Sequence, residues 1–155
     1  MLFRSKVLRQ ARGLALEPFL SELFEAFDLQ PRGAFKITGE QIDGAFQLGS
    51  ERFILEAKWE KDAVDERPIS GFERKIDRRL DNTLGLFISL NGFSDDGVKA
   101  VQRSRPNLIL MDGRDLASVI EGCIDLRELI ERKLRFAAET GDIYLPVHVI
   151  LNEKK

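Results

Sequence analysis

The chain has 155 residues, 43% hydrophobic and 32% charged, which is typical of one globular domain with its own core rather than of a disordered chain. Its 24 Lys and Arg residues against 26 Asp and Glu residues give a net charge of -2, which excludes an overall basic nucleic-acid coat protein but not a local basic patch. The single cysteine, Cys123, and the single histidine, His148, exclude a disulfide framework and a His- or Cys-rich metal centre. No apolar run is long enough for a membrane span or a signal peptide, so we expect an intracellular, cytoplasmic protein with no membrane partner.

Hydrophobic spacing predicts helices and strands in alternation along the chain. Apolar residues three and four apart predict helices, whereas alternating or continuous apolar runs predict strands. In chain order the expected elements are a helix over 14–29, a short strand over 34–38, strands over 41–48 and 51–59, a helix over 69–80, a strand over 84–90, a helix capped by Ser94 and ending near 102, a strand over 107–111, a helix from 112 or 113 to 121, and a helix over 126–138. The segment 144–151 fits either an edge strand or a tail.

This order of elements predicts the fold class. Strands joined through a helix run parallel, whereas strands joined by a tight turn run antiparallel. We therefore expect an α/β fold in which a mixed central sheet is flanked by helices on both faces, in a single domain over residues 1–155. The helix over 69–80 is expected to bury one apolar stripe, formed by Ile69, Phe72, Ile76 and Leu80.

The two strands on either side of Gly49-Ser50 carry the most informative pattern. Gly followed by Ser suits the two-residue turn of a β-hairpin, which fixes the register of the pair. The residues that then face each other are Leu48 and Glu51, Phe46 and Phe53, Gly44 and Leu55, Asp43 and Glu56, and Ile42 and Ala57.

This register gathers Asp43, Glu56 and Lys58 on one face of the hairpin, because side chains alternate along a strand. Facing carboxylates, with Cβ atoms roughly 4.5–5.5 Å apart, repel each other, and a divalent cation between them removes that cost. Oxygen ligands with no His or Cys nearby favour Mg²⁺ or Mn²⁺ over zinc. The alternative is a solvated cluster of ion pairs. Since the strand over 51–59 is expected inside the sheet, where a merely solvated face is uncommon, we favour a site for phosphodiester hydrolysis.

At these residues the chain resembles a known family. Asp43, twelve intervening residues and then Glu56-Ala57-Lys58 resemble the motif of the PD-(D/E)XK nuclease superfamily. The text QIDGAFQLGSERFILEAKW is most similar to the restriction-endonuclease-like, Mrr-type branch, although Ile42 stands where the motif has proline. The resemblance covers about residues 14–121 and implies a restriction-endonuclease-like α-β-β-β-α-β core, with a C-terminal helix and tail over 122–155.

The resemblance also implies roles for individual residues. Asp43 and Glu56 match the acids that bind Mg²⁺ or Mn²⁺, the Ala57 carbonyl matches a backbone ligand, and Lys58 matches the catalytic lysine. The family often takes a further acid from its first helix. Glu17 fits that position best, and Glu22 on the same helix is the alternative.

The activity that these roles imply is metal-dependent endonucleolytic hydrolysis of DNA. DNA is then the expected partner, and sequence recognition would come from a second copy of the chain in a homodimer or from a partner recognition domain. The alternatives are a catalytically inactive DNA-binding or assembly module with a nuclease fold, and an RNA or junction nuclease. Basic residues of the helix over 69–80 are candidates for phosphate contacts, or else form a solvated face: Arg74, Lys75, Arg78 and Arg79.

Overall fold

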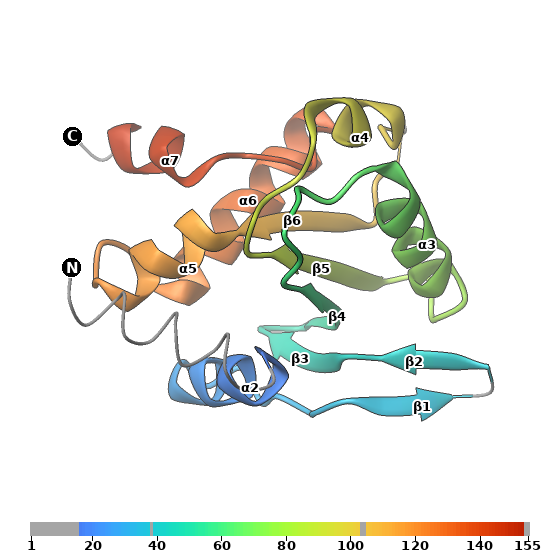
Figure 1. Ribbon diagram of the computed structural model, residues 1–155. Coiled ribbons are helices and arrows are strands. Elements are labelled where there is room, and N and C mark those ends of the chain that lie inside the picture. The colour runs from blue at the N-terminus through green and yellow to red at the C-terminus, as the bar shows by residue number, and fades with distance from the viewer. Residues whose placement is uncertain (1–15, 38, 103–104, 154–155) are drawn as a thin grey trace.

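The computed structural model describes residues 16–37, 39–102 and 105–153, and its centre is a mixed four-stranded sheet (Figure 1). The strands are ordered β3 (Gly44–Leu48), β4 (Glu51–Lys58), β5 (Thr83–Ser89) and β6 (Leu108–Asp112). β3 pairs antiparallel with β4, and the other two pairs are parallel. The predicted mixed sheet, with β4 in its interior, is therefore confirmed.

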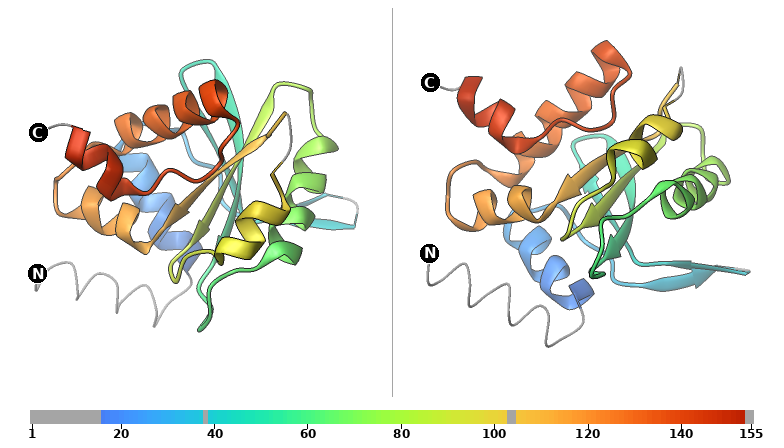
Figure 2. Two further views of the ribbon diagram at one scale, coloured as in Figure 1. Left: turned by 90° about the horizontal axis from the view of Figure 1, so that it is seen from above. Right: turned by 45° about the horizontal axis from the view of Figure 1, so that its top comes forward.

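Helices cover both faces of this sheet, as predicted (Figure 2). One face packs against α2 (Leu16–Ala26), α5 (Gly113–Ile120), α6 (Leu126–Thr140) and α7 (Val147–Glu153). The other face packs against α3 (Glu66–Asp77) and α4 (Asp95–Ala100). The sheet thus has one apolar core on each face, because successive side chains of a strand point to opposite faces.

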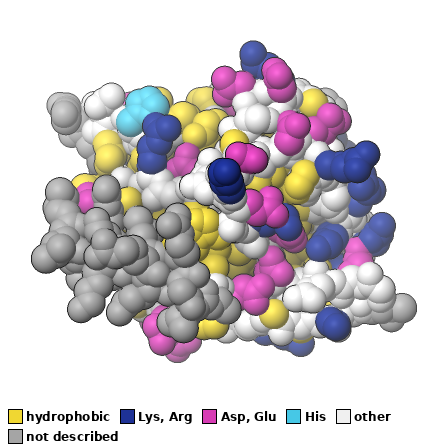
Figure 3. Space-filling view, in the orientation of Figure 1, with side chains coloured by type: hydrophobic (Ala, Val, Ile, Leu, Met, Phe, Trp, Pro, Cys, Tyr) yellow, Lys and Arg dark blue, Asp and Glu magenta, His cyan; other side chains and the backbone are white. Residues whose placement is uncertain are grey.

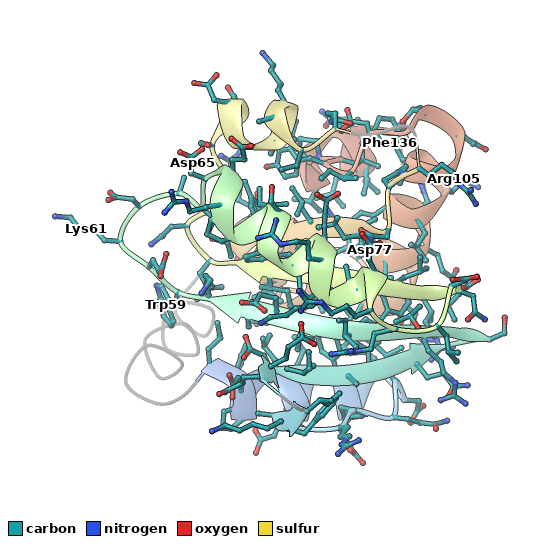
Figure 4. The ribbon with its side chains drawn as sticks, turned by 90° about the vertical axis from the view of Figure 1, so that its right-hand side faces the viewer. Trp59, Lys61, Asp65, Asp77, Arg105 and Phe136 are labelled. Atoms are coloured by element: carbon teal, nitrogen blue, oxygen red, sulfur yellow. The ribbon has the colours of Figure 1, made fainter. Side chains whose placement is uncertain are left out.

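Close packing fixes α3 against β5, and Gly85 permits it. A Cβ atom at Gly85 would lie 2.2 Å from the Ile76 side chain and 2.7 Å from the Phe72 ring. Any larger residue would therefore push α3 away from the sheet. The far end of the helix is held by Asn107, whose Nδ2 donates to Asp77 Oδ1 at 2.8 Å, and Figure 4 shows the helix lying across the sheet.

The predicted hairpin register is confirmed from Leu48↔Glu51 to Gly44↔Leu55, with Gly49 at a φ of 60° in the turn. The predicted strand over 41–48 is wrong, because the chain divides it into two. Its first part is β2 (Glu40–Ile42), which pairs with β1 (Phe35–Ile37) in a separate two-stranded sheet that projects from the body (Figures 1 and 2). The ladder pairings predicted for Asp43 and Ile42 with β4 are therefore absent from the described pairing of β3 and β4.

Two predictions about helices are also wrong. The helix expected over 69–80 ends at Asp77, and the Arg79 N–H closes the turn on the Ile76 carbonyl at 2.9 Å, so Leu80 is 78% exposed rather than buried. The segment 144–151 is neither an edge strand nor a tail. Residues beyond Pro146 form α7, which buries Val147 and Ile150.

The remaining predicted elements lie within a few residues of their expected bounds, including the helix capped by Ser94, whose hydroxyl accepts from the Gly97 N–H. The predicted start of the first helix, at Leu14, lies outside the described residues. Among the helices that the structure describes, none is long and apolar enough to cross a membrane.

A buried polar cluster joins α5, α6 and the segment before α7. Lys133 is 1% exposed, lies 3.1 Å from Asp115 Oδ1 and donates to the Leu145 carbonyl at 2.7 Å. Asp115 also accepts from the Asp112 N–H, and Tyr144 donates to Asp112 Oδ2 at 2.8 Å. The contact with Lys133 is an ion pair rather than an aligned hydrogen bond, and burial raises the pKa of Asp115 to about 7 in spite of it.

We predict that breaking this pair on either side destabilises the fold, and that the loss of Lys133 makes stability depend on pH. Asp115→Asn leaves a buried lysine without its counter-charge and should cost about 3–5 kcal/mol of unfolding free energy. Lys133→Met leaves an acid whose folded pKa already lies above its unfolded value of 3.8, so the native state holds its proton more tightly. The Met variant should therefore lose stability as pH rises from about 4 to beyond 7. Urea unfolding at several pH values measures both effects.

The double variant Asp115→Asn/Lys133→Met is the control. The double variant should be less destabilised than the sum of the two single variants, because it leaves no buried charge behind. Strict additivity would contradict coupling between the two residues.

Candidate active site

Asp43 lies where the projecting hairpin β1–β2 meets the central sheet. In a continuing antiparallel ladder, the Ala57 N–H would bond to the backbone of Ile42. Asp43 Oδ2 accepts that hydrogen bond instead, at 3.0 Å. The acid is therefore fixed beside Glu56 by its own side chain and not by a cross-strand pair.

Glu56 is held between two lysines. Its carboxylate lies 3.8 Å from the Nζ of Lys58 on the same strand and 3.3 Å from the Nζ of Lys75 on α3. Lys75 also donates to the Gln41 carbonyl at 2.9 Å, which ties α3 to β2. The Glu56 side chain is only 13% exposed, so the two ammonium groups supply much of the compensation that water gives an exposed carboxylate.

Glu17 in the first turn of α2 reaches the same acids. Partial burial raises its pKa, and the charge of Asp43, a side-chain hydrogen bond to Asp43 and the charge of Glu56 raise it further. Glu22, the alternative acid of this helix, is exposed. The backbone of Leu29 and Arg32, beyond the end of the helix, bonds to β3 and so anchors α2 beside the sheet.

Repulsion between the acids also affects Glu56. Burial raises its pKa, the charge of Asp43 raises it further, and Lys75 and Lys58 oppose the change. The carboxyl groups of Glu17 in α2, Asp43 between β2 and β3, and Glu56 in β4 thus interact electrostatically.

These oxygen donors fit a hard divalent cation in type and charge, because such an ion would offset the burial and the repulsion that raise the pKa values of Glu17 and Glu56. They do not form a ready cage. Within residues 16–37, 39–102 and 105–153, no group of three or more Asp, Glu, His or Cys side chains is arranged to hold a metal ion. Lysines pair with Glu56 and a backbone N–H bonds to Asp43 Oδ2, so a metal ion would have to use the remaining lone pairs of these carboxylates.

The four basic residues predicted as phosphate contacts have different neighbours. Arg78 and Arg79 bind the Glu40 carboxylate of β2, with Arg79 Nη2 at 2.7 Å. Arg74 is exposed, whereas Lys75 lies against Glu56. Figure 3 shows Lys and Arg side chains gathered toward the edge where Figure 1 has α3.

Sequence reasoning placed Lys75 among phosphate contacts and missed its contact with Glu56. The sequence offers only a weak indication of this contact, because a lysine on a charged helix usually faces solvent. Only the close approach of α3 to β4 brings it to the acid. Trp59, which directly follows Lys58, lies just beyond the end of β4 (Figure 4).

Comparison with known proteins places the chain in a family. Residues 8–120 match the Mrr_cat family, which is described as restriction endonuclease. Among curated proteins, no relative matches the chain.

Two solved structures have a similar fold. One is the MspJI restriction endonuclease in complex with a 27-mer oligonucleotide, at a TM-score of 0.54 and 15% identity over 93% of this chain and 36% of that one. The other is the DNA modification-dependent restriction endonuclease AspBHI, at a TM-score of 0.55 and 17% identity over 90% of this chain and 40% of that one. The chain thus spans well under half the length of either neighbour.

We predict that Asp43→Asn raises stability at neutral pH. The amide keeps an oxygen that accepts from the Ala57 N–H but removes the charge that repels Glu17 and Glu56. Acids with a raised folded pKa bind protons more tightly in the native state, so the wild type loses stability as pH rises from about the unfolded value of 4.5 through the raised values. The variant should lose less, by about 1 kcal/mol or below, because solvent screens the groups.

Urea unfolding at pH 4 and pH 7 measures this difference. The two proteins should be close at pH 4, where Glu17 and Glu56 are largely protonated and the charge of Asp43 has little to repel, and diverge at pH 7. A variant that is less stable at pH 7 would mean that the two lysines outweigh the repulsion.

Proposed function

The chain belongs to the restriction endonuclease family, and on this premise we propose that it is a metal-dependent endonuclease that hydrolyses phosphodiester bonds of DNA. The observation that carries the proposal is the gathering of Asp43, Glu56 and Lys58 beside the end of β4, with Glu17 added from α2. Repulsion between neighbouring acids lowers the free energy of unfolding unless a bound cation offsets it.

In this proposal Asp43, Glu56 and Glu17 hold Mg²⁺ or Mn²⁺, together with the Ala57 carbonyl. The Ala57 N–H points to the edge where the ladder with β3 has ended, and the carbonyl of the same residue points to that edge too. When bound, such an ion polarises a phosphoryl oxygen and lowers the pKa of a water molecule.

Lys58 has the remaining role. Its Nζ lies 3.8 Å from Glu56, so it faces the region that the acids share. An ammonium group there would stabilise negative charge that develops on the phosphate and orient the attacking water. Lys58 would also neutralise part of the acid charge that otherwise repels the DNA backbone.

Recognition of a DNA sequence, we propose, comes from another domain, a partner or a second copy of this chain. The described residues are largely taken up by the sheet and its covering helices. In support, the two similar endonucleases are much longer than this chain.

One observation favours an inactive DNA-binding or assembly module instead. The acids are held by a backbone N–H and by lysines rather than arranged around one point. Metal binding therefore separates the two functions, since an inactive module would bind no metal ion at these acids.

We predict that Mn²⁺ binds the wild type by calorimetric titration and supports nicking of a plasmid, and that Asp43→Asn and Glu56→Ala lose both. Lys58→Ala should keep most of the metal binding but cleave about 10²–10³-fold more slowly, because it removes stabilisation of developing charge. A labelled RNA serves as the second substrate, and its cleavage is compared with that of the DNA. Failure of the wild type to bind Mn²⁺ would instead support the inactive module, and preferential cleavage of RNA would identify an RNA nuclease.

The choice of helix acid gives a further prediction. Glu17→Gln should weaken Mn²⁺ binding, because the amide cannot supply the negative charge beside Asp43. Glu22→Gln is the matched control, an exposed residue of the same helix, and should bind Mn²⁺ like the wild type. Equal weakening of both variants would point to general loss of acidity rather than to a ligand.

A further inference from the structure

A pocket of about 350 Å³ opens beside the candidate site, between β4 and α3. Glu56 and Lys58 line it from the strand. From the helix it is lined by Arg67, Pro68, Gly71, Phe72 and Lys75. Residues four apart on a helix lie above one another, so Arg67, Gly71 and Lys75 form one stripe along the pocket wall.

The charge of this pocket is positive although that of the whole chain is negative. Three cations, from Lys58, Arg67 and Lys75, line it against the single carboxylate of Glu56. The side chains of Lys58 and Lys75 remain 31% and 25% exposed while they contact that acid. Arg67 is exposed and forms no ion pair with any residue in the described ranges. The pocket therefore has unused positive charge.

Gly71 leaves room between the two basic residues of the stripe. A Cβ atom there would meet nothing nearer than an Arg74 guanidinium nitrogen at 3.9 Å. The wall between Arg67 and Lys75 is thus bare backbone in the middle of a helix, where glycine is otherwise a poor choice. A tetrahedral oxyanion could approach the helix closely at this point.

We propose that this pocket binds a backbone phosphate of the nucleic acid next to the phosphate that is cleaved, with Arg67 and Lys75 as its binding residues. This inference rests on the proposed function, because the pocket then lies along the path of the nucleic-acid strand that enters the active site. Guanidinium groups bind phosphate oxygens through paired donors, and Lys75, which contacts Glu56 and the Gln41 carbonyl, would give its third N–H to the phosphate. Such a contact positions the strand and reads no base.

Binding of a fluorescent DNA duplex, measured by anisotropy with a chelator present, tests the proposal without cleavage. Arg67→Ala should weaken binding about three- to tenfold on every sequence and lower the slope of log affinity against log salt by about 1. Arg135→Ala is the matched control, since Arg135 is exposed on α6 at the opposite face of the sheet. It should leave affinity and slope unchanged.

A second pair of variants separates charge from volume. Gly71→Glu and Gly71→Gln place side chains of equal size in the pocket, and both residues favour a helix more than glycine does. The Glu variant should weaken DNA binding much more than the Gln variant, and far-UV circular dichroism should show both folded.

The phosphate-binding proposal would be overturned if the Arg67→Ala variant bound DNA like the wild type. It would also be overturned if Gly71→Glu and Gly71→Gln had equal effects. Neither result would touch the proposed function, which depends on Mn²⁺ binding and nicking. Conversely, if the chain binds DNA through Arg67 but neither binds Mn²⁺ nor nicks DNA, the phosphate pocket is supported and the proposed nuclease activity is contradicted.

Discussion

The hydrogen bond from the Ala57 N–H to Asp43 Oδ2, 3.0 Å long, is the contact on which the rest of the site depends. It replaces a ladder bond, so the antiparallel pairing of β3 with β4 stops at Gly44↔Leu55. The chain before Asp43 is then free to pair elsewhere and forms the projecting hairpin β1–β2. One side-chain acceptor thus ends a strand pair and fixes an acid next to Glu56.

The position of α3 is the second constraint. Gly85 lets Phe72 and Ile76 press against β5, and this brings Lys75, which lies between them in sequence, to Glu56. Lys75 then also binds the Gln41 carbonyl of the outer hairpin. A helix that packs on the core through one side therefore supplies a counter-charge to the acids through another.

The chain uses buried charge in two different ways. Asp115 and Lys133 are sealed in the core, where a cation and an anion of the same chain compensate each other and hold three segments together. Around Asp43 and Glu56, three acids lie near two lysines, and burial, with repulsion added to it, raises the pKa values of Glu17 and Glu56. In the first arrangement Lys133 offsets part of the burial cost of Asp115, whereas the second is typical of a functional site.

Sequence patterns alone predicted the mixed α/β sheet, the hairpin register around Gly49 and the strand face that carries Glu56 and Lys58. These follow from local rules, since turn chemistry sets register and the period of two sets the face of a strand. Sequence patterns could not indicate that Asp43 leaves the ladder, because a side chain that competes with the backbone for one N–H has the same sequence pattern as a continuing strand. The early end of α3, which exposes Leu80, depends likewise on a turn closed by Arg79.

The choice between Glu17 and Glu22 was open from spacing alone, and the structure places Glu17 near Asp43 and leaves Glu22 exposed. Only the tertiary structure brought Lys75 to Glu56 and formed the pocket beside Lys58. Contacts between residues far apart in the chain depend on how closely a helix packs on a sheet. That distance is set by the volumes of residues such as Gly85 and Phe72, and not by the periodicity that a sequence displays.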